Sequence, residues 1–346
     1  MKNVILQGDA LTKLKELPEK SINMCMTSPP YWALRDYGVD GQLGLEPTFD
    51  KYISELCDIF DGVKKVLRDE GTCWVNIGDT YMGNSSYSKK GRQGFGNDKI
   101  GMINKKKWVD PKFPHEGRLR GREHIEKCNI PSKSLSMIPM RFAIEMVNRG
   151  WILRNTIIWH KPNAMPCSAK DRFTVDFEYV FLFSKQKKYY FETQREPHLW
   201  ADRDKRSKVI GGVKSGGKSA TGNYATNKVC YHPDGRTKRT VWSITTKANK
   251  ESHFATYPEE LCETPIKAGC PEGGIVLDPF FGSGTTGVVA LKQNKNYIGI
   301  ELNPEYIEIA EKRLKPFREQ TSLNLNKITN QQVFKHQNIN KEVKND

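Results

Sequence analysis

Two short segments of the 346-residue chain combine residue types that could carry chemistry, and the first lies near residue 280. Its glycines Gly282, Gly284 and Gly287 fit the pattern G-x-G-x-x-G, and Glu301 follows nineteen residues after the first of them. Such glycines allow a tight turn and a close backbone approach, and the later carboxylate can bind ribose hydroxyls. The pattern predicts a site for an adenosine-containing cofactor. The alternative is a tight turn between strand and helix that binds no ligand. A Walker loop is excluded, because no Gly-Lys-Ser/Thr follows the glycines.

The second segment reads Ser28-Pro29-Pro30-Tyr31-Trp32 and follows an apolar run at residues 22–26. Two successive prolines have a fixed φ and no N–H donor, so they make a rigid elbow whose carbonyl groups point in definite directions. An aromatic pair follows at once. The alternative is a structural turn that caps a strand, with Tyr31 and Trp32 as core residues.

Both segments end strands in a pattern that alternates between strands and helices. Strands are expected at residues 4–6, 22–26, 72–77, 151–159, 178–183, 275–277 and 297–300, and helices at residues 49–67, 137–148, 257–268, 285–292 and 304–314. This alternation predicts an α/β fold with a doubly wound, mostly parallel sheet and helices on both faces. Ligands of such sheets bind beyond the carboxyl ends of the strands, which is where both segments lie.

The net charge of +15 is confined to two stretches of the chain. Residues 84–130 carry 12 Lys or Arg against 5 Asp or Glu, and residues 185–250 carry 16 against 5. The rest of the chain is nearly neutral. Two basic stretches in such a chain indicate a polyanionic partner, most simply nucleic acid. The alternative is a pair of solvated loops.

Composition excludes several other classes of protein. The chain has no apolar run of about 18 residues, so no transmembrane helix is expected. The first ten residues include Lys2 and Asp9, which does not fit a secretory signal. Eight cysteines without a C-x-x-C pair indicate reduced thiols and no metal site. We therefore expect a cytoplasmic protein, either associated with the nucleoid or encoded by a phage.

Taken together, the motifs closely resemble the amino-group DNA methyltransferases. Ser28-Pro29-Pro30-Tyr31 near the N-terminus and Asp278-Pro279-Phe280 followed by Gly282-Ser283-Gly284-Thr285 near the C-terminus carry the resemblance, supported by residues 159–163, 253–258 and 297–303. Enzymes of this family transfer methyl from S-adenosylmethionine to the exocyclic amine of cytosine or adenine. The order of the motifs resembles the circularly permuted β group, with a Rossmann-like methyltransferase fold and an inserted basic region that recognises the target.

The resemblance implies four regions. Residues 1–184 would form the catalytic half with a basic loop at residues 84–130, and residues 185–250 would recognise the target. Residues 251–316 would form the cofactor-binding half, and residues 317–346 a flexible tail.

It also implies a role for particular residues. The catalytic residues would be Ser28, Pro29, Pro30 and Tyr31, with Tyr31 stacked on a flipped base. The cofactor would contact Asp9, Phe254, Ala255, Thr256, Asp278, Pro279, Phe280, Gly282, Ser283, Gly284, Thr285, Thr286, Glu301 and Asn303. DNA would contact Trp32, Arg35, Lys161, Arg195, Arg203, Arg206, Arg236 and Arg239. For two of these residues an alternative to cofactor contact stays open: Asp9 would cap a helix, and Phe254 would be a core residue. Many members of the family have Lys where Tyr257 stands.

Ser28 favours the N4 amine of cytosine as the target, because cytosine-N4 enzymes usually carry Ser at this position and adenine-N6 enzymes usually carry Asp or Asn. Adenine-N6 methylation stays the alternative. The implied partners are double-stranded DNA and a cognate restriction endonuclease, and both a monomer and a homodimer stay open. A nicotinamide-dependent oxidoreductase would leave Ser28–Trp32 and the basic stretches unexplained. A DNA-binding protein that has lost catalysis would not need the complete set of motifs.

The charge distribution generates a prediction about salt. The affinity for duplex DNA should fall steeply as ionic strength rises, because phosphate contacts release counterions. Binding of S-adenosylmethionine should change little over the same range. Fluorescence anisotropy with labelled duplex and calorimetry with the cofactor would measure both, and equal responses would contradict the assignment of charge to the DNA-binding surface.

Overall fold

The computed structural model describes residues 1–34, 38–82, 128–197, 234–246 and 257–319. Several of the predicted residues lie outside these ranges: Arg35, most of the basic stretch 84–130, Arg203, Arg206, Phe254, Ala255, Thr256 and residues 320–346 of the tail. In the described part, no helix has the length and apolar content needed to cross a membrane.

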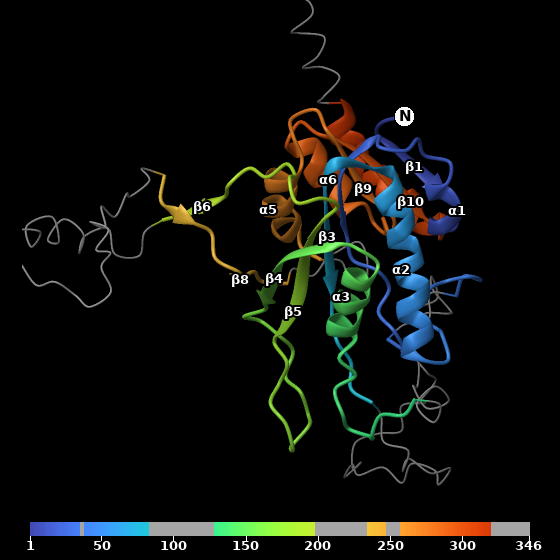
Figure 1. The fold of residues 1–346 in the computed structure, drawn as a ribbon, viewed down its shortest axis with the longest axis vertical. Helices are drawn as coiled ribbons and strands as arrows, with labels where there is room; N and C mark the ends of the chain where they lie inside the picture. The colour runs from blue at the N-terminus through green and yellow to red at the C-terminus, as the bar shows by residue number, and fades with distance from the viewer. Residues whose placement is uncertain (35–37, 83–127, 198–233, 247–256, 320–346) are drawn as a thin grey trace, which may run out of the picture.

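An eight-stranded sheet forms the centre of the protein (Figure 1). Its strands lie in the order β1 (Val4–Gln7), β10 (Asn296–Glu301), β9 (Ile275–Asp278), β2 (Ile22–Thr27), β3 (Leu67–Ile77), β5 (Phe177–Ser184), β4 (Ile152–His160) and β8 (Val241–Ser243). Only β5 runs antiparallel to its neighbours. The predicted fold class, an α/β protein with a mostly parallel sheet, is confirmed.

The strand directions bring distant segments to one edge of the sheet. The carboxyl ends of β1, β10, β9, β2, β3 and β4 meet there, and the reversed direction of β5 brings its first residues to the same edge. Strands β2 and β9 are direct neighbours, with Cys25 beside Leu277. The two motifs therefore lie side by side although about 250 residues separate them in the chain.

Helices cover both faces of the sheet. The helices α1 (Ala10–Leu14), α2 (Phe49–Val66) and α3 (Ile138–Asn148) pack on one face, and α5 (Glu259–Gly269), α6 (Thr285–Lys292) and a helix over residues 304–319 pack on the other. The strands alternate between these two cores: Cys25 and Phe183 face the first, whereas Met26 and Leu182 face the second. Buried side chains on both faces are typical of parallel sheets, which explains the continuous apolar runs in the sequence.

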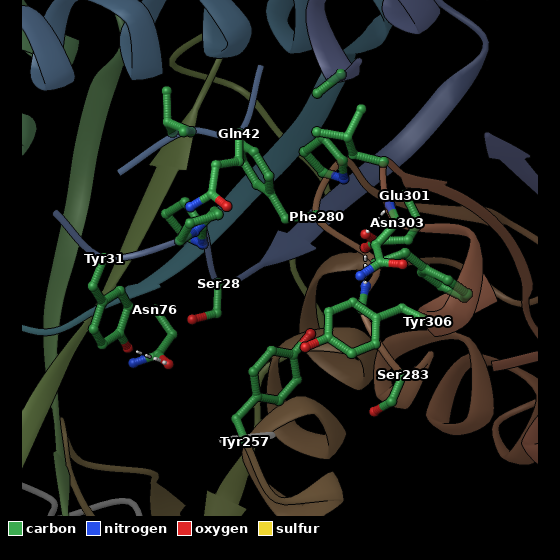
Figure 2. Close-up of a pocket in the computed structure, with 18 of the residues that line it drawn as sticks. Ser28, Tyr31, Gln42, Asn76, Tyr257, Phe280, Ser283, Glu301, Asn303 and Tyr306 are labelled. Atoms are coloured by element: carbon green, nitrogen blue, oxygen red, sulfur yellow. Dashed lines mark hydrogen bonds between the residues drawn. The ribbon is translucent and has the colours of Figure 1, made fainter. Parts of the chain in front are cut away.

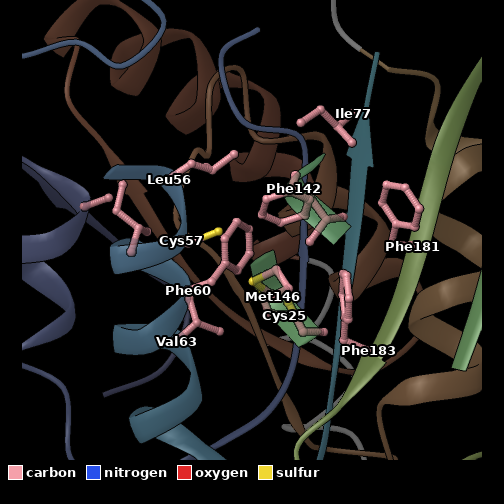
Figure 3. Packing of buried hydrophobic residues seen from close by; sticks show 14 of the residues in the cluster. Cys25, Leu56, Cys57, Phe60, Val63, Ile77, Phe142, Met146, Phe181 and Phe183 are labelled. Carbon is pink, nitrogen blue, oxygen red and sulfur yellow. The ribbon is translucent and has the colours of Figure 1, made fainter. Parts of the chain in front are cut away.

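The first core is built around aromatic side chains (Figure 3). The apolar residues of α2 recur at helical spacing, and Thr48 caps its first turn by accepting a hydrogen bond from the Lys51 N–H. The ring of Phe60 on α2 lies 5.3 Å from that of Phe142 on α3, which in turn lies 6.0 Å from Phe183 on β5. This packing fixes α2 and α3 against the central sheet at β5.

Three features differ from the sequence-based expectations. The strand expected at residues 72–77 begins earlier, at Leu67, and the last helix continues to residue 319, so residues 317–319 of the expected flexible tail are helical. The stretch 185–250, expected to lie outside the catalytic half, contributes β8 to the central sheet. It also forms a two-stranded ribbon, β6 (Arg195–Glu196) with β7 (Arg236–Thr237), which projects from the body in Figure 1.

Candidate active site

A cavity of about 770 Å³ opens at the edge of the sheet where the strand ends meet. The segments after β1, β2, β9 and β10 line it together with the first residues of β5. Figure 2 shows Ser28, Tyr31 and Asn76 on one side and Glu301, Asn303 and Tyr306 on the other, with Phe280 and Tyr257 between them. The volume is in the range of cavities that hold cofactors and small substrates.

The carboxylate of Asp278, at the end of β9, joins the segments around this cavity. Its Oδ1 accepts hydrogen bonds from Thr27 Oγ1 at 2.6 Å and from the Phe280 N–H at 3.1 Å. Its Oδ2 accepts from Thr286 Oγ1 at 2.6 Å and from the Tyr257 hydroxyl at 3.1 Å. One side chain thus connects β9 to the end of β2, to the first turn of α6 and to the segment before α5.

Asp278 is 1% exposed, and burial raises the pKa of its carboxyl group. The hydrogen bonds from Thr27 and Thr286 are the largest of the opposing influences, since they stabilise the charged form. Within the part of the chain that the structure describes, its hydrogen-bonding partners are neutral hydroxyl and amide donors and include no cationic side chain.

The glycines between β9 and α6 serve both the turn and the packing. Gly284 has a φ of 79°, and a Cβ there would lie 3.0 Å from the Cβ of Ala310. A Cβ on Gly287 would lie 2.7 Å from the ring of Phe281. From the last helix, Arg313 donates to the carbonyl and to the hydroxyl of Ser283, both at 2.7 Å. The loop is therefore held in one shape by contacts on its outer side.

Glu301, at the end of β10, lies directly beside the glycine loop. Its Oε2 accepts the Gly282 N–H at 2.7 Å, and its Oε1 accepts the Asn303 N–H at 2.9 Å. Burial raises the pKa of this carboxyl group, and backbone hydrogen bonds partly oppose the shift. A carboxylate has about four acceptor sites, more than the backbone groups of Gly282, Leu302 and Asn303 use. It can therefore accept hydroxyl groups of a ligand.

The Pro-Pro elbow forms the opposite side of the cavity, where Ser28, Pro29 and Pro30 all line the wall. The hydroxyl of Tyr52 on α2 donates to the Pro30 carbonyl at 2.8 Å. This contact anchors the elbow to the first core and occupies one of the two lone pairs of the Pro30 oxygen. The Ser28 hydroxyl and the Pro29 carbonyl are further acceptors on the same elbow.

Tyr31 belongs to a hydrogen-bonded chain that runs along the edge of the sheet. Its hydroxyl donates to Glu178 Oε2 at 2.7 Å and lies 3.3 Å from Asn76 Oδ1. Asn76 Nδ2 donates to the same Glu178 oxygen at 3.1 Å, and Lys161 forms an ion pair with the other one. Burial raises the pKa of Tyr31 well above its ordinary value, and the Glu178 carboxylate raises it further. The phenol is therefore neutral and its ring is held in one orientation.

Most of the described residues predicted from the sequence meet around this one cavity. Its wall includes Asp9, Ser28, Pro29, Pro30, Tyr31, Lys161, Pro279, Phe280, Gly282, Ser283, Thr285, Glu301 and Asn303. Asp278, Gly284 and Thr286 do not line it and lie behind the loop that does. Asp9 also acts as the helix cap that was its alternative, because its Oδ1 accepts the Thr12 N–H at 2.9 Å.

Trp32, which was predicted to contact DNA, is buried in this structure. Its side chain is 2% exposed, its Nε1 donates to the Glu46 carbonyl at 3.0 Å, and its ring packs edge-on against Phe49. The alternative interpretation as a core residue holds for Trp32. Arg195, Arg236 and Arg239 lie at the β6–β7 ribbon and do not line the cavity; Glu196 accepts from both Arg236 and Arg239.

The wall residues that sequence reasoning did not assign to the site include Asn76, Glu178, Tyr257 and Tyr306. Asn76 stands just before the end of β3, so its place in a strand that ends at the ligand edge was a usable signal. Glu178 stands at the beginning of β5, and only the reversed direction of that strand brings it to the cavity. Burial raises the pKa of Tyr257 well above its ordinary value, and its hydroxyl also contacts Thr286.

The cavity thus joins the end of β10, which carries Glu301, to the Ser28 elbow at the end of β2, with β9 between these two strands. Residues 22–312 match the model of the family described as DNA methylase. The chain belongs to the DNA methylase family.

Curated relatives and solved structures agree with this membership. The chain is 41% identical over 311 residues to the type II methyltransferase M.Cfr9I of Citrobacter freundii, covering 90% of this chain and 87% of that protein. It is 38% identical to the type II methyltransferase M.SmaI of Serratia marcescens, covering 90% of each. The solved PvuII DNA methyltransferase (cytosine-N4-specific) shares the fold with a TM-score of 0.56 at 20% identity, covering 90% of this chain and 86% of that one.

Membership of this family makes S-adenosylmethionine the cofactor of the protein. The residues of the cavity fit it. Glu301 has a carboxylate that could accept a ribose hydroxyl, Tyr306 lies at the same end of the cavity, and Phe280 lies between this end and Ser28. The cavity continues from there to Ser28 and Tyr31, which leaves a place for the group that is methylated.

Replacing Asp278 by the isosteric, neutral Asn should change how stability depends on pH. The folded-state pKa of Asp278 is raised, so the folded protein binds its proton more tightly than the unfolded chain does. As pH rises from the ordinary aspartate pKa toward the raised folded-state pKa, the free energy of unfolding of the wild type should therefore fall. The free energy of unfolding of Asp278→Asn should lack this contribution. Urea unfolding of both proteins at a series of pH values would measure this difference, and parallel curves would contradict it.

Proposed function

We propose that the protein is a type II DNA methyltransferase that transfers methyl from S-adenosylmethionine to the N4 amine of cytosine in duplex DNA. The observation that carries this proposal is the single cavity that joins Glu301 to the Ser28–Tyr31 elbow. A cofactor bound at the first end and a base bound at the second would share one enclosed space. Transfer would then be direct, without a covalent enzyme intermediate.

The acceptors of the elbow address the main difficulty of the reaction. An exocyclic amine is a poor nucleophile because its lone pair is delocalised into the ring of the base. The Ser28 hydroxyl and the Pro29 carbonyl would accept its two hydrogens and draw the nitrogen toward a tetrahedral geometry. Fixed acceptors of this kind act by positioning and by stabilising the charge that develops. The bond from Tyr52 to Pro30 supports this role, because it holds the elbow in place before substrate binds.

Tyr31 would stack on the target base once the base has left the duplex. Its hydrogen bond to Glu178, which Asn76 and Lys161 also contact, keeps the ring from rotating away. Gly78 supports this arrangement, because a Cβ there would lie 2.7 Å from the Tyr31 ring. The ring is thus confined between the end of β3 and the beginning of β5.

On the cofactor side, S-adenosylmethionine supplies an electrophilic methyl group on a sulfonium when bound. Glu301 would hold the ribose hydroxyls, and Asn303 and Ser283 would line the pocket beside it. Asp9 would reach the adenine amine from the end of β1 while it caps α1. Asp278 and Thr286 would act from behind the wall, by fixing the loop rather than by touching the cofactor.

The choice of cytosine rests on Ser28. A hydroxyl and a carboxylate or amide present different acceptor geometries to the amine, and Ser is usual in the cytosine-N4 enzymes that this chain resembles. Adenine-N6 methylation by the same machinery is the alternative.

The sheet order supports the circularly permuted β arrangement. The strand that precedes the glycine loop, β9, is late in the chain, but it pairs directly with β2, which carries the Ser28 elbow. Joining the halves in the other order would leave these neighbours unchanged, so a permuted chain can build the same site.

The basic stretch 185–250 would recognise DNA through the β6–β7 ribbon, since a two-stranded ribbon fits the major groove. Arg239 is more exposed there than Arg236, and both share Glu196 as a partner. The similarity to type II methyltransferases supports a cognate restriction endonuclease as the biological partner. We place the enzyme in the cytoplasm, where its DNA lies.

Tyr31→Ala should nearly abolish methyl transfer to DNA, because the base loses its stacking partner, worth about 1–3 kcal/mol per base. Tyr31→Phe keeps the ring and loses only the hydrogen bond to Glu178, so it should retain more activity. Tritium transfer from labelled S-adenosylmethionine to duplex DNA measures both. Full activity of the Ala variant would contradict the role of Tyr31.

The modified nucleoside decides the target base. Mass spectrometry of nucleosides from DNA methylated in vitro should find N4-methylcytosine. N6-methyladenine in its place would overturn the assignment based on Ser28 and keep the family. If neither modified nucleoside forms in the presence of cofactor and a varied DNA substrate, the proposed function is wrong.

A further inference from the structure

The segment between β4 and β5, residues 161–176, extends beyond the sheet as a long loop (Figure 1). It carries two large apolar side chains that are almost fully exposed, Met165 at 86% and Phe173 at 95%. Among the exposed large hydrophobic residues of the described chain these are the two most exposed. Water around such side chains is unfavourable, so their exposure calls for an apolar partner.

The loop is anchored on both arms. On its first arm, Asn163 Nδ2 donates to the Thr246 carbonyl at 2.8 Å, and Asn163 Oδ1 accepts the Thr246 N–H at 2.9 Å. On its second arm, Asp171 pairs with Lys133 at 2.7 Å, and the guanidinium of Arg172 lies 3.7 Å from the centre of the Tyr81 ring. Met165 and Phe173 are therefore held out by an anchored loop.

Met165 also lines the cavity, although most of its surface is exposed. These two facts place it at the mouth. It follows Lys161 by four residues, and Lys161 is connected through Glu178 to Tyr31. The mouth beside Met165 is therefore the one that leads to the elbow of Ser28 and Tyr31, where the target base would bind.

The second arm lies where the first basic stretch leaves and rejoins the body. Residues 80–82 and 134–136 are joined by backbone hydrogen bonds, and Tyr81 and Leu135 form a bridge between them. The stretch 84–130, with its excess of Lys and Arg, connects these two segments. Asp171 and Arg172 contact these two joined segments, at Lys133 and Tyr81 respectively.

We propose that this loop inserts Met165 and Phe173 into the DNA duplex at the place that the target base leaves. This inference rests on the proposed function, because a base can reach Ser28 only after it has left the stack. Apolar side chains that enter a base step replace the lost stacking contacts and hold the duplex open. Met165 lies at the mouth through which the base would pass, and the same loop carries Phe173. Neutral apolar side chains fit the interior of a base stack rather than its phosphates.

The test compares a matched duplex with one in which the target base has no partner. The methylated site is first mapped by sequencing DNA treated with the wild type, and synthetic duplexes are then made with either the normal complement or an abasic position opposite the target. Single-turnover methylation is measured for wild type, Met165→Ala/Phe173→Ala, Tyr31→Ala and Ile144→Ala. Ile144 is the matched control, because it is an apolar residue on α3 that is 62% exposed and does not line the cavity.

The double variant should be slower by about tenfold or more on the matched duplex, which corresponds to the loss of one stacking-sized contact. On the abasic duplex its rate should return to within about threefold of the wild type, because an unpaired base costs little to flip. Tyr31→Ala should be slow on both duplexes, and Ile144→Ala normal on both. Cofactor affinity should be the same for the double variant and the wild type.

A double variant that is normal on the matched duplex, or equally slow on both duplexes, would overturn the insertion. A wild-type dimer in light scattering that the double variant lacks would assign the two side chains to a protein interface instead and would also overturn it. Failure of the wild type to methylate any duplex contradicts the proposed function itself. The two failures are therefore distinguishable.

Discussion

The buried carboxylate of Asp278 is the interaction on which the arrangement of the site depends. Its four hydrogen bonds come from three different segments: Thr27 at the end of β2, Phe280 and Thr286 around the glycine loop, and Tyr257 before α5. Removing the carboxylate would leave these donors without an acceptor. An unsatisfied buried donor lowers the free energy of unfolding. The geometry of the elbow and the geometry of the cofactor loop are thus fixed by one side chain, and neither is set independently of the other.

This coupling has a consequence for catalysis. Methyl transfer needs the donor and the amine within a few tenths of an ångström of a productive distance, and small misplacements are expensive. The elbow is held at Thr27 by Asp278 and at Pro30 by Tyr52, so both of its ends are fixed. The cofactor loop is held by Asp278 from within and by Arg313 from the last helix. Both the elbow and the glycine loop are therefore held by contacts within the protein.

Two of the alternatives that the sequence left open concern the class of enzyme and the places of Tyr31 and Trp32. A glycine loop with a distant acidic residue also suits a nicotinamide enzyme, but membership of the DNA methylase family excludes that function. Tyr31 and Trp32, adjacent in the chain, separate into a cavity residue and a core residue, because successive residues after a strand end point in different directions. The exposure of Met165 and Phe173 had no signal in the sequence, since single apolar residues between two strands can equally belong to a core.

The sequence by itself determined the alternation of strands and helices, the two motifs and the acidic residue that faces the glycine loop, because these depend on local spacing and residue type. It predicted Ser28, Tyr31 and Glu301 at strand ends, where parallel sheets place their ligands. Only the tertiary structure decided that β2 and β9 are neighbours and that β5 is reversed. Strand pairing depends on contacts between residues far apart in the chain, so the roles of Asp278 and Glu178 emerged only from the folded protein.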